Sequence, residues 1–141
     1  MRTTFITGFP GETQEEFDEL HRFIQEFHFD ALGVFEFSPE EGTAAATMDD
    51  QIPVEVARER AEILMATQRD IVETANENSM GRRLDVLVDG VDEEGYCIGR
   101  HSGQAPEIDG VCFFTEPREA GEMVSCEVTD FDGYDLIVTP V

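Results

Sequence analysis

The hydrophobic pattern of this chain changes near Arg82, and this change restricts the possible folds more than any other feature. Before Arg82, apolar residues recur at helical spacing over residues 14–28 and again over residues 53–79. After it, short apolar stretches alternate with polar residues and are separated by Gly, Pro, Asp and Glu. We therefore expect an α/β segment followed by an all-β module. The predicted strands of that module are residues 84–88, 96–100, 108–115, 123–129 and 134–138.

The first part of the chain predicts a strand, a helix and a second strand joined by short links. Residues 3–8 and 32–37 have the apolar and aromatic content of strands, and they flank the first helix. Such a unit is normally parallel and right-handed. Two strands and one helix cannot cover both faces of a parallel sheet, so we expect one face to be exposed and the segment to be a piece of something larger. The apolar residues concerned are Phe5, Ile6, Val34, Phe35 and Phe37.

Two glycines, Gly8 and Gly11, lie between the first strand and the first helix. A phosphate-binding P-loop has four residues between its glycines and continues with Lys and Ser/Thr. Gly8 and Gly11 are separated by two residues, and the residue that follows is Glu12, an anion. Spacing and charge therefore argue against phosphate. Thr13 and Glu16 fit a capping box, so we expect a tight turn that leads into a capped helix.

The chain of 141 residues has a formal net charge of −23, and all nine of its basic residues are arginine. With 40% hydrophobic residues it can still build a core. The acidity is even, because residues 1–80 carry 5 basic and 18 acidic residues and residues 81–141 carry 4 and 14. Such a chain should repel nucleic acid and attract a basic partner. A lysine-free, acid-rich composition also suits a proteome adapted to high salt, and both interpretations stay open.

The three cysteines, Cys97, Cys112 and Cys126, lie in predicted strands and form no Cys-x-x-Cys pair. We expect them to be buried as small hydrophobic side chains, with no metal site. The three histidines are scattered along the chain and suggest no ligand set. No apolar run approaches the roughly 18 residues of a membrane span, and the N-terminus does not resemble a signal peptide. We therefore expect a cytoplasmic protein that does not contact a membrane.

Three segments resemble one protein family in the same order, namely Phe5–Thr13, Phe37–Thr43 and Gly81–Arg83, which opens the β module. Over essentially all of its length, the chain resembles the C-terminal portion of a radical-SAM methylthiotransferase. Two further stretches, Ala105–Gly110 and Asp132–Leu136, are similar to the RimO branch of that family. Members of this branch methylthiolate an aspartate of a small-subunit ribosomal protein.

The resemblance implies three parts. Residues 1–50 would be the incomplete C-terminal end of the radical-SAM domain, a terminal βαβ piece of a partial (β/α) barrel. Residues 51–80 would form a long linking helix. Residues 81–141 would form a TRAM domain, a five-stranded OB-like β-barrel. The fold class is thus α/β plus all-β. The order of helices and strands predicted from hydrophobic periodicity alone agrees with this class.

The resemblance also implies functional residues. In radical-SAM enzymes the first of these strands packs against the adenine of S-adenosylmethionine, which would give a cofactor site made by Ile6, Gly8 and Phe37. Phe37 stands where the family often has Tyr. The β-barrel would recognise a basic ribosomal protein of the small subunit through an acidic edge that includes Asp132 and Asp135. The implied substrate-binding residues are Pro106, Glu107, Asp109 and Tyr134.

The family holds its 4Fe-4S clusters with cysteines that none of the three in this chain matches. No metal ligand or catalytic residue is therefore assigned, and we expect this chain alone to be monomeric, inactive and free of bound cofactor. Two alternatives stay open. One is a fragment of a tRNA methylthiotransferase, for which a basic barrel would be expected. The other is a stand-alone, non-catalytic binding module of the TRAM or OB-like type.

Overall fold

The computed structural model describes residues 1–106 and 108–141. The chain divides into two compact units, Met1–Ile71 and Val72–Val141, and each is described by itself. The first unit contains β1 (Arg2–Thr7), α1 (Gln14–Phe27), β2 (Ala31–Glu36), a short 3-10 turn η1 (Ala45–Thr47) and the first part of the long helix α2 (Val54–Glu77). The strands of the second unit are β3 (Arg83–Val91), β4 (Cys97–His101), β5 (Cys112–Phe114), β6 (Met123–Asp132) and β7 (Asp135–Pro140).

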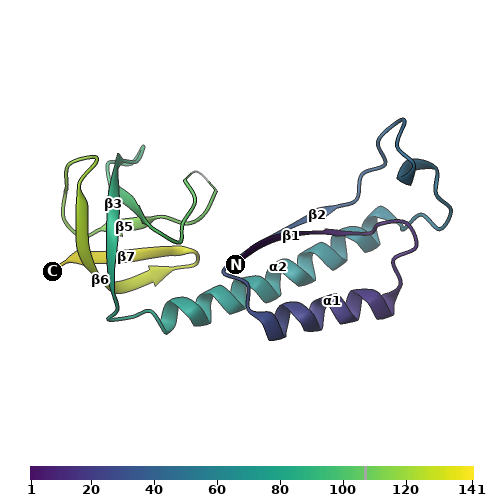
Figure 1. Ribbon diagram of the computed structural model, residues 1–141, viewed down its shortest axis with the longest axis horizontal. Coiled ribbons are helices and arrows are strands. Elements are labelled where there is room, and N and C mark those ends of the chain that lie inside the picture. The colour runs from purple at the N-terminus through teal and green to yellow at the C-terminus, as the bar shows by residue number, and fades with distance from the viewer. Residues whose placement is uncertain (107) are drawn as a thin grey trace. The chain divides into compact units, whose positions relative to one another are not determined.

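The strands β1 and β2 form a parallel pair, as the sequence predicted, with Thr3 opposite Leu32 and Ile6 opposite Phe35. The chain continues this pairing by one residue, because the Phe37 N–H donates to the Thr7 carbonyl at 2.8 Å. Both helices cover the same face of the pair (Figure 1). Between the sheet and the helices lies a core made of Phe17, Ile24, Phe29, Leu32 and Leu64, with Phe5 and Val34 packed against it.

The other face of this sheet carries exposed apolar side chains. Ile6 is 54% exposed and its neighbour Phe35 is 64% exposed. Successive residues of a strand point to opposite faces, so Phe5 and Val34 contact the helices, whereas Ile6 and Phe35 do not. The expectation of an uncovered face is confirmed at Ile6 and Phe35 and is wrong at Phe5 and Val34. The reason is that α2, expected only as a link, adds a second helix to the covering layer.

The start of α1 has the predicted capping box. The Thr13 hydroxyl accepts the Glu16 N–H at 3.2 Å, and the Glu16 carboxylate accepts the Thr13 N–H at 2.9 Å. Each side chain thus satisfies a backbone donor that the first turn of a helix leaves without an intrahelical partner. The helix ends at Phe27, and the capping residue His28, in a left-handed conformation (φ 55°), donates its N–H to the Ile24 carbonyl.

The capping box should make the stability of the Met1–Ile71 unit depend on acid pH. The pKa of the Glu16 carboxyl is lowered, first by the Thr13 backbone N–H and then by the Thr13 hydroxyl. A group with a depressed folded-state pKa stabilises the fold above its unfolded-state pKa, which is about 4.3 for Glu, and loses this contribution as pH falls through the folded value. We expect Glu16→Gln to flatten the pH dependence of unfolding below about pH 4.3. Chemical denaturation at several pH values would measure this, and parallel curves for the two proteins would contradict it.

The second unit is a closed five-stranded barrel with the strand order β3-β4-β5-β7-β6 (Figure 1). All neighbouring strands are antiparallel except β5 and β7, which are parallel. This is the arrangement expected for a small OB-like barrel. Val124, Cys126 and Val128 alternate with more exposed residues and point into the core, as predicted. The buried core residues are Val86, Val88, Cys97, Cys112, Phe114, Val124, Cys126, Val128, Leu136 and Val138.

One predicted strand is much shorter than expected. Residues 108–115 were predicted as a strand, but β5 covers only Cys112–Phe114. The residues before it turn back on themselves, because the Asp109 N–H donates to the Ala105 carbonyl at 3.2 Å. The predicted hairpin at Asp132 and Gly133 is present, with Gly133 in a left-handed conformation (φ 57°). In the part of the chain that the structure describes, no helix has the length and apolar content needed to cross a membrane.

Candidate functional site

The turn after β1 is held against α2 at very short range. Gly8 has a φ of +76°, a conformation that residues with a side chain rarely adopt. A Cβ atom added at Gly8 would lie 2.3 Å from the Cβ of Ala57 in α2. The glycine is thus required by the close approach of a helix from the same unit. Next to it, the buried Thr7 hydroxyl donates to the Ala57 carbonyl at 2.8 Å.

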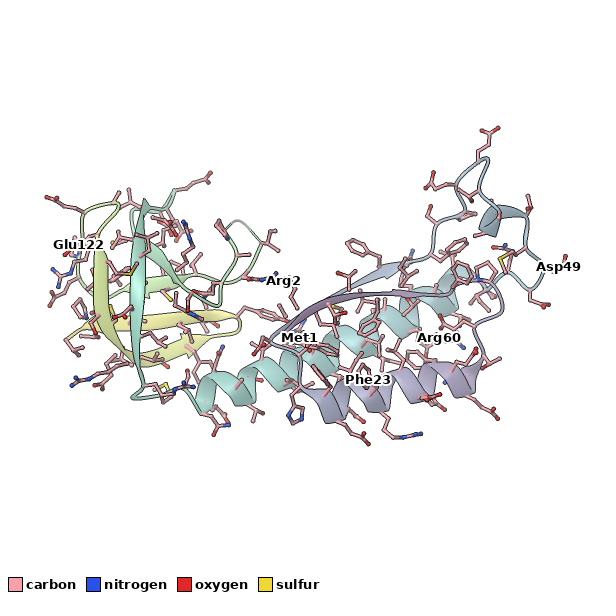
Figure 2. All side chains as sticks on the ribbon, viewed as in Figure 1. Met1, Arg2, Phe23, Asp49, Arg60 and Glu122 are labelled. Atoms are coloured by element: carbon pink, nitrogen blue, oxygen red, sulfur yellow. The ribbon has the colours of Figure 1, made fainter. Side chains whose placement is uncertain are left out.

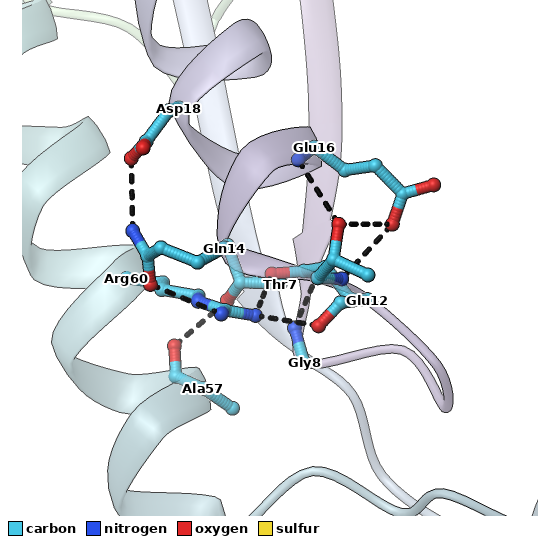
Figure 3. A network of polar contacts seen from close by, with 9 residues as sticks. Thr7, Gly8, Glu12, Gln14, Glu16, Asp18, Ala57 and Arg60 are labelled. Carbon is cyan, nitrogen blue, oxygen red and sulfur yellow. Dashed lines mark hydrogen bonds and ion pairs between the residues drawn. The ribbon is translucent and has the colours of Figure 1, made fainter.

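A chain of charged and polar contacts fixes the same turn (Figure 3). The Gly8 N–H donates to Oε2 of Glu12 at 2.7 Å, and Oε1 of Glu12 lies 2.6 Å from Nη1 of Arg60. Arg60 also donates to the Glu12 carbonyl at 3.2 Å and to the Gln14 side chain at 3.3 Å. The Glu12 carboxylate therefore already accepts the Gly8 N–H that a bound phosphate would need, which agrees with the argument against a phosphate site. Arg60 was not singled out in the sequence, where nothing indicates that it lies near Gly8.

The three predicted cofactor-binding residues lie at the carboxyl end of β1 and β2 but not on one surface. Ile6 is exposed on the uncovered sheet face. Phe37 is partly buried and packs edge-to-face on Phe9, with ring centroids 5.3 Å apart. Gly8 is buried, its missing side chain faces α2, and its N–H is bound to Glu12. Ligands of parallel sheets bind outside the carboxyl ends of the strands, so Ile6, Phe37 and the exposed Phe9 are suitably placed for an apolar contact.

A second candidate site lies on the barrel, where the loop Ala105–Gly110 meets the hairpin between β6 and β7. A Cβ added at Gly110 would lie 2.1 Å from the Tyr134 carbonyl oxygen. The Val111 N–H donates to the Asp135 carboxylate at 2.7 Å, and the Leu136 N–H donates to the Val111 carbonyl at 2.9 Å. The structure thus brings together the two sequence stretches that were similar to the RimO branch. We name this surface the loop–hairpin edge, defined by residues 105, 106, 108–110 and 132–135.

The predicted substrate-binding residues have different roles at the loop–hairpin edge. Pro106 is exposed and Tyr134 is 41% exposed, while Glu107 lies outside the described residues. The Asp109 carboxylate accepts the Ala105 N–H at 2.6 Å, and so it closes the loop on itself. Asp135 similarly accepts from Val111. Two of the acidic residues predicted to face a partner are therefore partly buried and each accepts a backbone hydrogen bond within the protein. Among the described acidic residues of this edge, Asp132 is the one whose side chain is exposed.

Burial shifts the pKa values of two titratable groups near this edge toward their neutral forms. Burial lowers the pKa of the His101 imidazole, and the nearby Asp109 carboxylate opposes that effect. His101 Nδ1 accepts the Gly103 N–H at 3.0 Å, so this histidine belongs to the loop. Burial raises the pKa of the Cys112 thiol to about 12. All three cysteines are free and buried, as predicted, and the described residues contain no group of three or more His, Cys, Asp or Glu able to hold a metal.

Comparison with known proteins finds similarity to the second unit alone and to almost the whole chain. Residues 80–141 match the family described as the TRAM domain. Proteins named "Ribosomal protein uS12 methylthiotransferase RimO" are 48% identical to this chain in Anaeromyxobacter sp. and in Aquifex aeolicus, and 47% identical in Synechococcus sp.. The alignments cover 96–97% of this chain but only 30–32% of each relative. The chain thus spans about a third of the length of the curated relatives it matches.

A solved structure, the apo form of Mycoplasma genitalium RNase R, has a TM-score of 0.35 to this chain at 12% identity, covering 62% of this chain and 18% of that one. This likeness is too weak to carry an argument.

Proposed function

We propose that this chain is part of an enzyme that modifies an aspartate of ribosomal protein uS12. The proposal rests on its similarity, along almost its whole length, to the RimO-type methylthiotransferases. In that enzyme the chain supplies substrate recognition and part of the cofactor contact. The recognition surface we propose is the loop–hairpin edge. The observation that carries this assignment is the bracing of Gly110 and Val111 by the hairpin, through the 2.7 Å bond from Val111 to Asp135 and the close packing of Gly110 on Tyr134. A surface fixed in this way loses little conformational entropy when it binds a partner.

The charge of the chain supports a basic protein as the partner. The net charge is −23, and a ribosomal protein that contacts RNA is expected to carry many Lys and Arg residues. Opposite net charges accelerate the association of two proteins. The negative charge of this chain also repels nucleic acid, which would otherwise compete for the surface. Exposed Pro106, Tyr134 and Asp132 give the edge a mixture of apolar and acidic groups, which suits a basic peptide segment better than a polyanion.

The cofactor contact we propose uses the uncovered end of the β1–β2 sheet. Ile6, Phe37 and Phe9 offer apolar and aromatic surface, which fits the adenine ring of S-adenosylmethionine. Gly8 would act by allowing the turn to pack on Ala57, which fixes where β1 ends. When bound, S-adenosylmethionine supplies radical and methyl-transfer chemistry in this family. The described residues do not fit an iron–sulfur cluster, because the three cysteines are enclosed in the barrel core.

The alternative of a tRNA substrate has one observation in its favour. Tyr96 is 59% exposed and packs edge-to-face on Phe113, with ring centroids 6.2 Å apart. These residues lie at β4 and β5, the second and third strands of the barrel, whose outer face binds oligonucleotides in other OB-folds. The acidity of the chain opposes this alternative.

A charge reversal tests the proposed recognition surface. Asp132→Lys should weaken uS12 binding by roughly threefold to tenfold, chiefly through slower association. The matched control is Glu122→Lys, since Glu122 is exposed and precedes β6, whereas Asp132 ends this ten-residue strand. The two positions lie at opposite ends of β6, whose length along the strand, at most about 3.3 Å per residue, is several times the roughly 10 Å over which 0.1 M salt screens exposed charges.

Association and dissociation rates of uS12 with the wild type and both variants, measured by surface plasmon resonance at several salt concentrations, would decide the matter. Equal losses at the two positions would mean that the acidity acts as a general surface property, and the edge would not be the binding site. Asp109→Lys is a less suitable variant, because it would also remove the contact that closes the loop.

A further inference from the structure

Arg60 is an unusual residue for the covered side of α2. It is 7% exposed, and among the described polar residues of this helix only Gln68 is also buried. It comes from a position 48 residues after Glu12 in the sequence, and its guanidinium reaches the turn after β1. Figure 2 shows Arg60 on α2 beside the N-terminal end of α1. Its guanidinium carbon also lies 5.3 Å from the centre of the Phe17 ring.

The ion pair between Arg60 and Glu12 is enclosed. The two side chains are 8% and 14% exposed. Breaking such a pair leaves an uncompensated charge in the interior, which is far more disruptive than loss of a surface pair. The same helix offers a surface pair for comparison, because Arg58 lies 3.6 Å from Glu36 with side chains 60% and 37% exposed.

The two oxygens of the Glu12 carboxylate connect α2 to the backbone of the turn. Oε1 contacts Arg60 and Oε2 accepts the Gly8 N–H. Arg60 thus holds Glu12 in the orientation in which it can accept from Gly8. Without Arg60 the buried carboxylate would gain by turning to water, and the Gly8 N–H would lose its acceptor. The strand itself stays paired with β2 as far as Thr7, so the part of the chain that would be released is the turn that follows it, two residues after Ile6.

We propose that Arg60 is a positioning residue, which acts through Glu12 and Gly8 to hold the end of β1 in the conformation that contacts the cofactor. This inference rests on the proposed function, because it takes the end of β1 to be part of an S-adenosylmethionine site. It assigns to α2 a role in the site itself, beyond linking two parts of the chain.

Amide hydrogen exchange, followed by NMR on the 141-residue chain, tests the brace directly. In Arg60→Met we expect exchange of the Gly8 amide to accelerate by about tenfold more than that of the Ile24 amide, since a hydrogen bond to a charged group contributes roughly that factor. Ile24 reports opening of the whole core of this unit, where it is fully buried. Arg58→Met removes the same charge from the surface of the same helix and should leave the Gly8 to Ile24 ratio unchanged. Arg60→Lys should restore part of the protection, because it keeps a charge next to Glu12.

A second measurement separates this inference from the proposed function. S-adenosylmethionine at millimolar concentration is added to the wild type and to Arg60→Met, and the Ile6 methyl and Phe37 amide resonances are followed. We expect both resonances to shift in the wild type and to shift less in Arg60→Met. Faster Gly8 exchange in Arg60→Met without any response of the wild type to S-adenosylmethionine would retain the brace and reject the cofactor contact. An unchanged Gly8 to Ile24 ratio in both Arg60 variants would overturn the inference, whether or not the wild type responds.

Discussion

Replacing Gly8 with alanine should destabilise the Met1–Ile71 unit by about 2–5 kcal/mol, the largest effect that we expect from a single methyl group in this unit. The new Cβ would lie 2.3 Å from Ala57 Cβ and 3.2 Å from its Cα, and the helix backbone cannot easily move aside. Overpacking of this kind costs roughly 1–3 kcal/mol. The left-handed conformation at φ +76° adds roughly 1–2 kcal/mol for a residue with a Cβ.

Gly11→Ala is the matched control for this effect. Gly11 has a similar φ of +85°, and a Cβ added there meets no atom within 4 Å. We therefore expect it to lose only the conformational contribution, roughly 1–2 kcal/mol. Hydrogen exchange of core amides in the two variants would compare them, with the barrel amides as an internal reference. Equal losses would show that Gly8 is needed for its backbone angle alone and that Ala57 does not restrict it.

Replacing Gly110 with alanine should separate the loop from the hairpin at the loop–hairpin edge. The new Cβ would lie 2.1 Å from the Tyr134 carbonyl oxygen and 2.6 Å from its carbon, so backbone must move on one side or the other. We expect a loss of about 1–3 kcal/mol in the stability of the barrel. Because the displaced loop carries the exposed Pro106, we also expect weaker binding of uS12 than Asp132→Lys produces.

Gly121→Ala serves as the control in the same barrel. Gly121 lies in open space with a φ of +88°, in the connection that precedes β6. Its replacement should cost roughly 1–2 kcal/mol through backbone strain and leave the affinity for uS12 unchanged. Chemical denaturation and a uS12 titration of both variants would separate the two contributions. Retention of full affinity by Gly110→Ala would exclude the loop as part of the binding surface.

Local sequence patterns predicted the elements of this protein well, because each depends on neighbouring residues. The capping box of Thr13 and Glu16, the hairpin at Gly133 and the alternation in β6 are all set within a few positions along the chain. The prediction for residues 108–115 was wrong in its extent, because Asp109 closes a loop through Ala105, and a side-chain bond of this kind leaves no periodic signal.

Contacts between distant residues could not be predicted in the same way. The glycine at position 8 indicated a close approach, but its partner Ala57 is 49 residues away and is one of several small residues of α2. The pairing of Glu12 with Arg60 also depends on how α2 packs, and a charge on a helix usually faces water. The backbone hydrogen bonds that Asp109 and Asp135 accept could not be predicted for the same reason, since most acidic side chains lie at the surface.

The most direct test of the central claim is a comparison of uS12 and tRNA as ligands of the 141-residue chain. Equilibrium affinities for both are measured with the same labelled protein at about 0.15 M salt, where screening reduces non-specific charge effects. The account predicts that uS12 binds more tightly than tRNA and that its affinity falls as salt is raised. Tighter binding of tRNA at this salt concentration would contradict the account and would favour the outer face near Tyr96 and Phe113 as the binding surface.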